Sequence, residues 1–498
     1  MSAKVLAIGL DSADKDLLLQ WSDSGVLPNI QRLRQRGLWA MVTSPPGLGD
    51  DATWATFYTG VSPARHGRFF THQVLPGSTR PVWFGDTRLK QEAFWEGLSR
   101  EGRKVGIFDV PKCTLSENIK GLHLVDWLVH GAVHQQMGSW PPSLASDVNS
   151  RFGKRPGSLC TYTTLGPNRF HEYVNRLLMT IEMKTALLTD YLDQDDWDLF
   201  LAVFKESHCV GHHCWHLHDP SHPEYDPEAA SALGNPVKQV YVALDAAIGR
   251  LLDKVDSETT VMVFSDLGMG PNYTGNVLLE EAIKRLEGFS IQSGKKTLGR
   301  LRSLWRKLPI SLRRPAFRKM SGVNQAMTNL EGSLPSYYTL PHNEISGAIR
   351  LNVVGREPHG RIHLGEEYTA VCEKLTEDLM SLVCLETGAP IVSKVLRVRD
   401  IFSGPFIDYF PDLLVIWNRK RPISNAWSPQ YGEIKVDLPP IRQGNHLPDG
   451  VLFASGPAIA ADQSIGLVSL MDLSATIAKR LGVALPNLDG VPIPEICE

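Results

Sequence analysis

Val5-Leu6-Ala7-Ile8-Gly9-Leu10, followed at once by Asp11, is the stretch of this chain that decides its fold. A short, continuous run of aliphatic residues is typical of a strand that is buried on both faces of a parallel sheet. Open α/β sheets place their chemistry at the carboxyl ends of such strands. We therefore interpret Asp11 either as a cap for the next helix or as a ligand at a functional site.

Similar apolar runs recur along the chain, with helical stretches starting near Asp14 and Pro28. The further runs lie at 104–108, 199–204, 259–264, 413–417 and 451–454. This alternation predicts an α/β fold with a mostly parallel central sheet and helices on both faces. We expect a single catalytic domain over residues 1–498.

The composition excludes several classes of protein. The 498 residues are 43% hydrophobic and carry a net charge of -3, which fits a soluble globular chain without affinity for nucleic acid. No apolar run is long enough to span a bilayer, and no signal segment precedes the first strand. Seven scattered cysteines without a CxxC motif favour reduced thiols and a cytoplasmic location.

A histidine-rich segment follows the run at 199–204. His208 and His212 are four residues apart, so on a helix they share one face and can bind one cation. His216, a further step of four, is the reserve ligand. Cys209 and Cys214 flank His212 and could also bind zinc, although small buried packing residues are the interpretation that we favour.

Three more residues complete a set suited to metal. Asp266 follows the run at 259–264 in a glycine-flanked turn, and His446 precedes the run at 451–454. Asp50 follows a Gly/Asp-rich loop just before a helix, where it can be a cap, a ligand or a nucleophile, and Thr53 places a hydroxyl nearby. With Asp11, His208 and His212, these residues are ligands enough for two divalent cations and predict an enzyme that acts on an anionic ester.

Residues 275–345 break the alternating pattern and form a predicted insertion or lid. Between 284 and 319 there are twelve lysines and arginines and one acid, Glu287, interleaved with apolar residues. We interpret the stretch as a basic helical insertion, either solvated or covering an anionic substrate. Docking on a membrane surface is the alternative.

Short motifs in a fixed order connect these candidate residues. They are Gly9-Leu10-Asp11, Leu27-Pro28-Asn29-Ile30, Trp54-Ala55-Thr56-Phe57-Tyr58-Thr59-Gly60, His66-Gly67, Gly211-His212, Ser265-Asp266, Arg350-Leu351-Asn352, Gly355-Arg356-Glu357-Pro358, Pro411-Asp412-Leu413 and His446 with Asp449-Gly450. Together they resemble the alkaline phosphatase superfamily, in particular the branch related to type I phosphodiesterases and nucleotide pyrophosphatases. The likeness spans nearly the whole chain.

The resemblance implies a two-metal hydrolase of a phosphate ester, a phosphodiester or a nucleotide pyrophosphate, with a small phosphate-containing substrate. It implies one ion at His208, His212 and His446, and a second at the positions of Asp11, Asp50, Asp266 and Leu267. Arg356 or an arginine of the insertion could hold the substrate anion. Zinc or iron suits the three histidines, and manganese, magnesium or iron suits the carboxylates.

Three departures from the family pattern leave the reaction open. Asp50 stands where the family has a Thr or Ser nucleophile, Leu267 replaces a histidine, and His208 replaces an aspartate. Asp50 could ligate metal, act as a base, or attack phosphorus to give an acyl phosphate. The alternative is a phosphatase scaffold that binds an anion without turnover, or that uses its metals for another reaction such as redox chemistry with iron.

Overall fold

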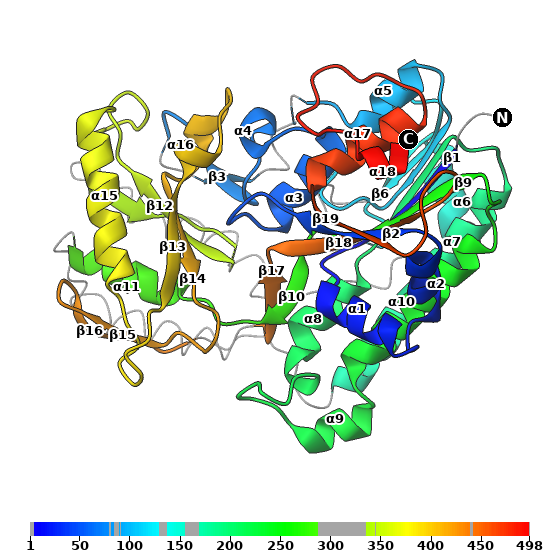
Figure 1. Cartoon of the computed structure of the whole chain (residues 1–498). Helices are drawn as coiled ribbons and strands as arrows, with labels where there is room; N and C mark the ends of the chain where they lie inside the picture. The colour runs from blue at the N-terminus through cyan, green and yellow to red at the C-terminus, as the bar shows by residue number, and fades with distance from the viewer. Residues whose placement is uncertain are drawn as a thin grey trace.

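The computed structural model of this protein describes residues 4–78, 81–83, 89, 91–128, 137–154, 169–286, 335–343, 345–438 and 442–497. A nine-stranded sheet forms its larger part (Figure 1). In spatial order the strands are β19 (Gln463–Ser469), β2 (Leu38–Thr43), β18 (Asp449–Ser455), β9 (Thr259–Phe264), β1 (Lys4–Leu10), β8 (Leu199–Phe204), β5 (Val105–Phe108), β6 (Gly121–Val125) and β7 (Gly138–Trp140).

The middle of this sheet is parallel, as the apolar runs predict. The block from β9 through β1, β8 and β5 to β6 is parallel throughout, whereas β18 and β7 pair antiparallel with their neighbours. All strands of a parallel block end at the same edge. The residues that follow β1, β8 and β9 are therefore brought together there.

Helices cover both faces of the sheet, and alternate residues of β1 show why the run is apolar throughout. Leu6 and Ile8 join one hydrophobic cluster, and Val5 and Ala7 join the cluster on the opposite face. The first face is covered by α1 (Lys15–Asp23), α2 (Pro28–Arg36), α7 (Phe170–Asp193), α8 (Glu206–Cys214) and α10 (Pro236–Leu252); the second is covered by α3 (Asp50–Thr59), α5 (Phe94–Arg100) and α17 (Leu470–Arg480). The predicted mostly parallel α/β sheet is confirmed.

A smaller antiparallel sheet lies to one side (Figure 1, left). Its order is β11 (Tyr337–Thr339), β12 (Ser346–Leu351), β14 (Leu413–Trp417) and β13 (Val392–Arg397), and its core includes residues of α11 (Asn276–Leu286) and α15 (Glu366–Met380). The run at 413–417, which we expected in the central sheet, forms β14. An apolar run signals a buried strand but does not say which sheet buries it.

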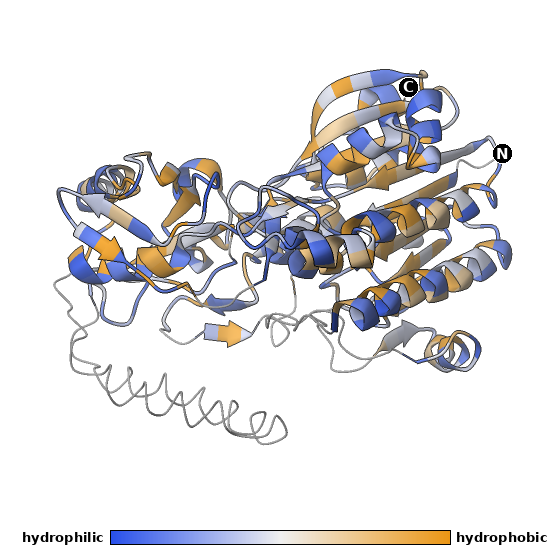
Figure 2. Cartoon of the chain, turned by 90° about the horizontal axis from the view of Figure 1, so that it is seen from below, coloured by the Kyte–Doolittle hydropathy of each residue, from blue (hydrophilic) through white to orange (hydrophobic). Residues whose placement is uncertain are grey.

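Shorter elements connect these layers. They are α4 (Pro63–His66), β3 (His72–Val74), β4 (Pro81–Trp83), α6 (Ser143–Arg151), the 3₁₀ turn η3 (Trp215–Leu217), α9 (Pro227–Leu233), β10 (Gly268–Pro271), α16 (Val398–Ile401), the 3₁₀ turn η4 (Ile407–Tyr409), β15 (Asn425–Ser428), β16 (Gly432–Lys435), β17 (Gly444–Leu447) and α18 (Pro494–Cys497). Figure 2 shows hydrophobic residues along the strands of the main sheet and mixed hydrophobic and hydrophilic residues on the helices.

The predicted insertion at 275–345 is only partly described. Its start forms α11, and β11 lies near its end, whereas residues 287–334 lie outside the described part of the chain. The same is true of most of the basic stretch at 284–319, so its interpretation as a lid or a membrane-docking surface stays a prediction. Within the described residues, no helix has both the length and the apolar character needed to span a bilayer.

Candidate metal centre

Two of the predicted histidine ligands come from the helix that follows β8. The helix α8 begins at Glu206, and His208 and His212 lie one turn apart on it, as their spacing of four predicts. Both side chains are about 1% exposed. Their ring centroids are 4.4 Å apart, so the two imidazoles lie against each other at the carboxyl edge of the sheet.

The third histidine lies on a short strand, β17. His446 belongs to β17, which pairs antiparallel with β10 and places His446 opposite Met269. Because β10 follows Asp266 by two residues, this pairing brings His446 to the end of β9. Its ring centroid lies 4.7 Å from that of His208 and 4.8 Å from that of His212.

The three imidazoles form a site that can hold one metal ion. One ring nitrogen from each lies within 4.8 Å of the others, and all three side chains are buried. His212 Nδ1 lies 2.7 Å from the carbonyl oxygen of Gly444, so it donates there and leaves Nε2 to bind metal. Burial, together with the charge of His208, lowers the pKa of His446 to about 3, which keeps this imidazole in the neutral form that binds metal.

Asp11 stands beside the histidines. Its Oδ2 lies 3.2 Å from His208 Nδ1, and its Oδ1 accepts a hydrogen bond of 3.2 Å from Trp54 Nε1 on α3. A carboxylate at one ring nitrogen of a histidine fixes the orientation of the ring and leaves the other nitrogen to bind a metal. The donor set therefore fits a metal held by the three histidines, with Asp11 against one of them.

Asp266 lies at the end of β9 and is fully buried. Its Oδ1 accepts the backbone N–H of Ser12 at 3.0 Å, and its Oδ2 accepts the hydroxyl of Thr53 at 2.6 Å. Burial and the neighbouring charges of Asp11 and Asp50 raise the pKa of Asp266 to about 7. Asp266 therefore lies near enough to Asp11 and Asp50 for their charges to act on it. Thr53 contacts a carboxylate there.

Asp50 is the first residue of α3, where the amino end of the helix favours negative charge. Burial alone would raise the pKa of Asp50, but Lys112, His446 and His208 hold it well below its usual value. Asp50 thus lies near the histidines as well as near Lys112. The six residues that we singled out converge on one place in the fold.

Lys112 is a residue of this centre that we did not predict. Its Nζ lies 2.6 Å from Asp50 Oδ2 and also pairs with Asp51, and the lysine side chain is 9% exposed. Burial alone would lower the pKa of Lys112, but the two carboxylates raise it, so the ammonium group stays charged. A buried, charged lysine therefore lies against the carboxylate of Asp50 in this centre.

The guanidinium group of Arg356 binds residues outside this metal centre. Its Nη1 and Nη2 bind Asp412 at 2.9 and 2.6 Å, its Nε binds Glu357 at 2.8 Å, and Nη2 also donates to the carbonyl of Leu351. These partners take up the donors that we expected to hold a substrate anion. They lie in the smaller sheet and its loops, which indicates a structural role for Arg356.

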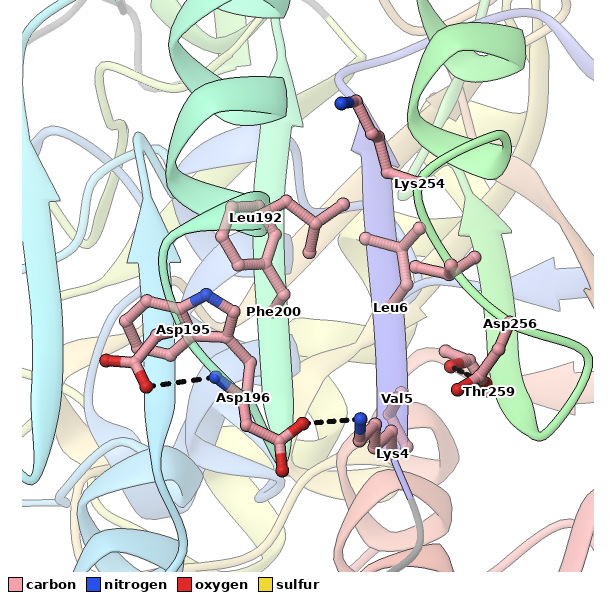
Figure 3. Close-up of a pocket in the computed structure, with 12 residues that line it drawn as sticks. Lys4, Val5, Leu6, Leu192, Asp195, Asp196, Phe200, Lys254, Asp256 and Thr259 are labelled. Carbon is pink, nitrogen blue, oxygen red and sulfur yellow. Dashed lines mark hydrogen bonds and ion pairs between the residues drawn. The ribbon is translucent and has the colours of Figure 1, made fainter.

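A small polar hollow at the opposite edge of the sheet is a different feature (Figure 3). It is lined by the amino-terminal ends of β1 and β9 and by the loop before β8, with Lys4 paired to Asp196. Parallel strands that start here end at the histidines. The hollow is therefore separated from the metal centre by the length of the strands, and it is not the site of the predicted chemistry.

A buried parallel α/β sheet with a histidine and carboxylate centre at its carboxyl edge is the architecture of the alkaline phosphatase superfamily. The sequence matches the family described as "Type I phosphodiesterase / nucleotide pyrophosphatase" over residues 5–395. The chain belongs to this family, and it is a phosphoester hydrolase by that membership. No curated protein matches the sequence.

Solved structures share the fold at low sequence identity. Murine ectonucleotide pyrophosphatase/phosphodiesterase 5 is 13% identical with a TM-score of 0.52, and the match covers 98% of this chain and 97% of that one. Phosphonoacetate hydrolase from Sinorhizobium meliloti 1021, in complex with phosphonoformate, is 12% identical with a TM-score of 0.54, and the match covers 96% of both chains. An inactive form of the murine protein was solved in complex with AMP.

Proposed function

We propose that this protein hydrolyses a phosphodiester or a nucleotide pyrophosphate with the help of a metal ion held by His208, His212 and His446. The observation that carries the proposal is the buried trio of imidazoles at the carboxyl edge of the sheet, with ring nitrogens within 4.8 Å of one another. The ligands of the structural neighbours, the phosphate ester AMP and the phosphonate phosphonoformate, support a small anionic substrate.

The bound ion would supply a Lewis acid and a water molecule of lowered pKa. The other groups of the centre belong to the chain itself. Lys112 places a positive charge beside Asp50, and the amino end of α3 adds free N–H groups that favour an anion. A phosphoryl group entering between α3 and the histidines would thus meet the bound ion on one side and the amino end of α3 on the other.

Asp50 takes a role other than that of a general base in this proposal. A base that works near neutral pH needs a pKa near the working pH, whereas Lys112 and the histidines hold the pKa of Asp50 well below its usual value. Asp50 remains a candidate nucleophile, since a carboxylate can form an acyl phosphate. Acid-quench trapping with labelled substrate tests whether Asp50 forms an acyl phosphate. Label on Asp50 shows the covalent intermediate, and unlabelled protein during turnover excludes it.

The test of function is a substrate screen on protein stripped with a chelator and reloaded with zinc, manganese or iron. Nitrophenyl phosphate, bis-nitrophenyl phosphate, the nitrophenyl ester of thymidine monophosphate and nitrophenyl sulfate cover the ester classes. We expect release of nitrophenol from the diesters, lost on chelation and in a His212→Ala variant. If no phosphoester turns over with any of the three metals, the proposal fails and the anion-binding or redox alternative takes its place.

A cytoplasmic location also remains a proposal. None of the cysteines in the described part of the chain forms a disulfide, which fits a reducing compartment. Fractionation of cells that express the chain with a detectable tag would test the location: recovery of the protein in the cytoplasmic fraction supports it, and recovery with membranes or outside the cell contradicts it.

A further inference from the structure

We propose that the ammonium group of Lys112 takes the place of a second metal ion, so that the centre binds one divalent ion, at His208, His212 and His446. The inference deepens the proposed function and rests on its histidine site. It differs from the two-ion centre that the sequence led us to expect. Four observations carry it, one for each position that would have served the second ion.

The first is Asp50, whose Oδ2 lies 2.6 Å from Lys112 Nζ. The same ammonium group pairs with Asp51, the next residue of α3. The backbone carbonyl of Lys112 accepts a hydrogen bond of 3.3 Å from Tyr58, also on α3, so the lysine is attached to this helix by both its side chain and its main chain. A second divalent ion at Asp50 would have to share the carboxylate with a fixed positive charge.

The second is Asp266, which is satisfied by donors of the protein. Each of its carboxylate oxygens accepts a hydrogen bond, one from the backbone of Ser12 at 3.0 Å and one from Thr53 at 2.6 Å. These two partners hold the carboxylate to the ends of β1 and α3. A side chain with both oxygens bound in this way is already stabilised without a metal.

The third is Asp11, which contacts the histidine site rather than standing apart from it. Its Oδ2 lies 3.2 Å from His208 Nδ1 and its Oδ1 accepts from Trp54 Nε1. Asp11 therefore supports the first ion through His208. A carboxylate commonly orients a metal-binding histidine in this way.

The fourth is Leu267, which stands where the family supplies a histidine. Its side chain is 0% exposed and has no atom that can bind a metal. Of the four positions, one thus has no ligand atom, one is paired to an ammonium group, and two are held by protein donors. The charge that a second ion would bring to Asp50 is supplied by Lys112 instead.

The experiment counts ions rather than turnover. Metal-free wild-type protein is dialysed to equilibrium against zinc or manganese, and bound metal per chain is measured by mass spectrometry. We expect one ion per chain for either metal. A His212→Ala/His446→Ala double variant should bind none, because the carboxylates do not form a site of their own; two ions in the wild type, or one in the double variant, overturns the proposal.

Substitution of the lysine tests its role directly. Lys112→Met removes the charge at similar length and leaves Asp50 and Asp51 without a cation, so the count should rise to two, whereas Lys112→Arg should keep it at one. Lys184→Met is the matched control, because Lys184 is a buried lysine paired at 3.0 Å with the buried Asp109, and its count should stay at one. A folded Lys112→Met variant that still binds one ion contradicts the proposal.

These counts do not depend on catalysis. If the substrate screen finds no activity while the wild type binds one ion, the proposed reaction fails and the assignment of Lys112 stands. If the enzyme is active and binds two ions, the proposed reaction stands and the assignment of Lys112 fails. Should Lys112→Met not fold, as judged by circular dichroism, the wild-type and double-histidine counts still decide the question.

Discussion

Nδ1 of His208 lies 3.2 Å from Oδ2 of Asp11, and this contact joins the end of β1 to the first turn of α8. The adjacent parallel strands β1 and β8 are thus each followed by one residue of this contact, Asp11 after β1 and His208 after β8. A carboxylate in this position holds the imidazole in one orientation and raises its basicity toward a metal at the other nitrogen. The contact favours an orienting role for Asp11 over direct ligation.

Asp11→Asn should therefore weaken metal binding without abolishing it. The amide keeps the size of the side chain but removes the negative charge, and loss of such a partner lowers metal affinity by about 10–100-fold. Competition with a chromogenic chelator measures the affinity. Asp16→Asn is the control, because Asp16 is exposed on α1 and contacts Lys15, and the same loss in both variants would contradict the role given to Asp11.

His212→Ala should abolish metal binding, whereas His216→Ala should leave it unchanged. His212 belongs to the buried trio, and His216, which we held in reserve as a ligand, instead packs its ring against Phe170 and His222 at centroid distances of 5.5 and 6.1 Å. Metal content after dialysis distinguishes the two variants. Loss of metal in His216→Ala would mean that His216 also reaches the ion.

Much of this site could be predicted because the relevant signals are local. The run at 5–10 is apolar at every position because both faces of β1 are covered, and Asp11 follows it directly. The spacing of His208 and His212 shows that they share a face of a helix whatever that helix packs against. Such features depend on neighbours in sequence, which a single chain displays.

Lys112 and the position of His446 depend on the tertiary structure instead. Lys112 lies in a loop after β5 with a φ of 56°, and nothing in Val110-Pro111-Lys112 distinguishes it from an exposed lysine. His446 reaches the site because β17 pairs with β10 in a particular register, and a four-residue strand has too short a pattern to predict a partner. Arg356 drew attention through its motif, and the structure places its guanidinium group against Glu357 and Asp412 in the smaller sheet and its loops.

Arg356→Met should destabilise the protein rather than impair substrate binding. The guanidinium is 4% exposed and bridges Asp412 and Glu357, so its removal leaves the buried Asp412 without its ion-pair partner, whereas Glu357 keeps Arg350 at 2.6 Å. Breaking a buried pair in this way costs about 3 kcal/mol or more of the free energy of unfolding. Urea unfolding measures the loss, and Arg361→Met, an exposed residue of the same loop, is the control. If Arg356→Met raises KM and leaves the free energy of unfolding unchanged, Arg356 contacts the substrate instead.

His66 should make the protein sensitive to acid through its buried, neutral imidazole. Its Nδ1 accepts the backbone N–H of Arg68 at 3.1 Å, and its Nε2 then donates to Thr56 Oγ1 at 3.0 Å, so both nitrogens are bound in the neutral form. Burial and the charge of Arg68 lower the pKa of His66 to about 3, against an ordinary value of 6.5. Below pH 6.5 the imidazole of His66 therefore binds a proton in the unfolded chain but stays neutral in the folded chain.

The sign of the effect follows from this difference. Stability from the neutral His66 is fully present above pH 6.5 and is lost as the pH falls toward 3, by about 1.4 kcal/mol per pH unit. Between pH 7.5 and 5.0 the wild type should lose about 2 kcal/mol more than His66→Asn, which does not titrate. Urea unfolding of both proteins with chelator present excludes any contribution from metal release, and parallel losses in the two proteins would show that His66 is already protonated in the fold.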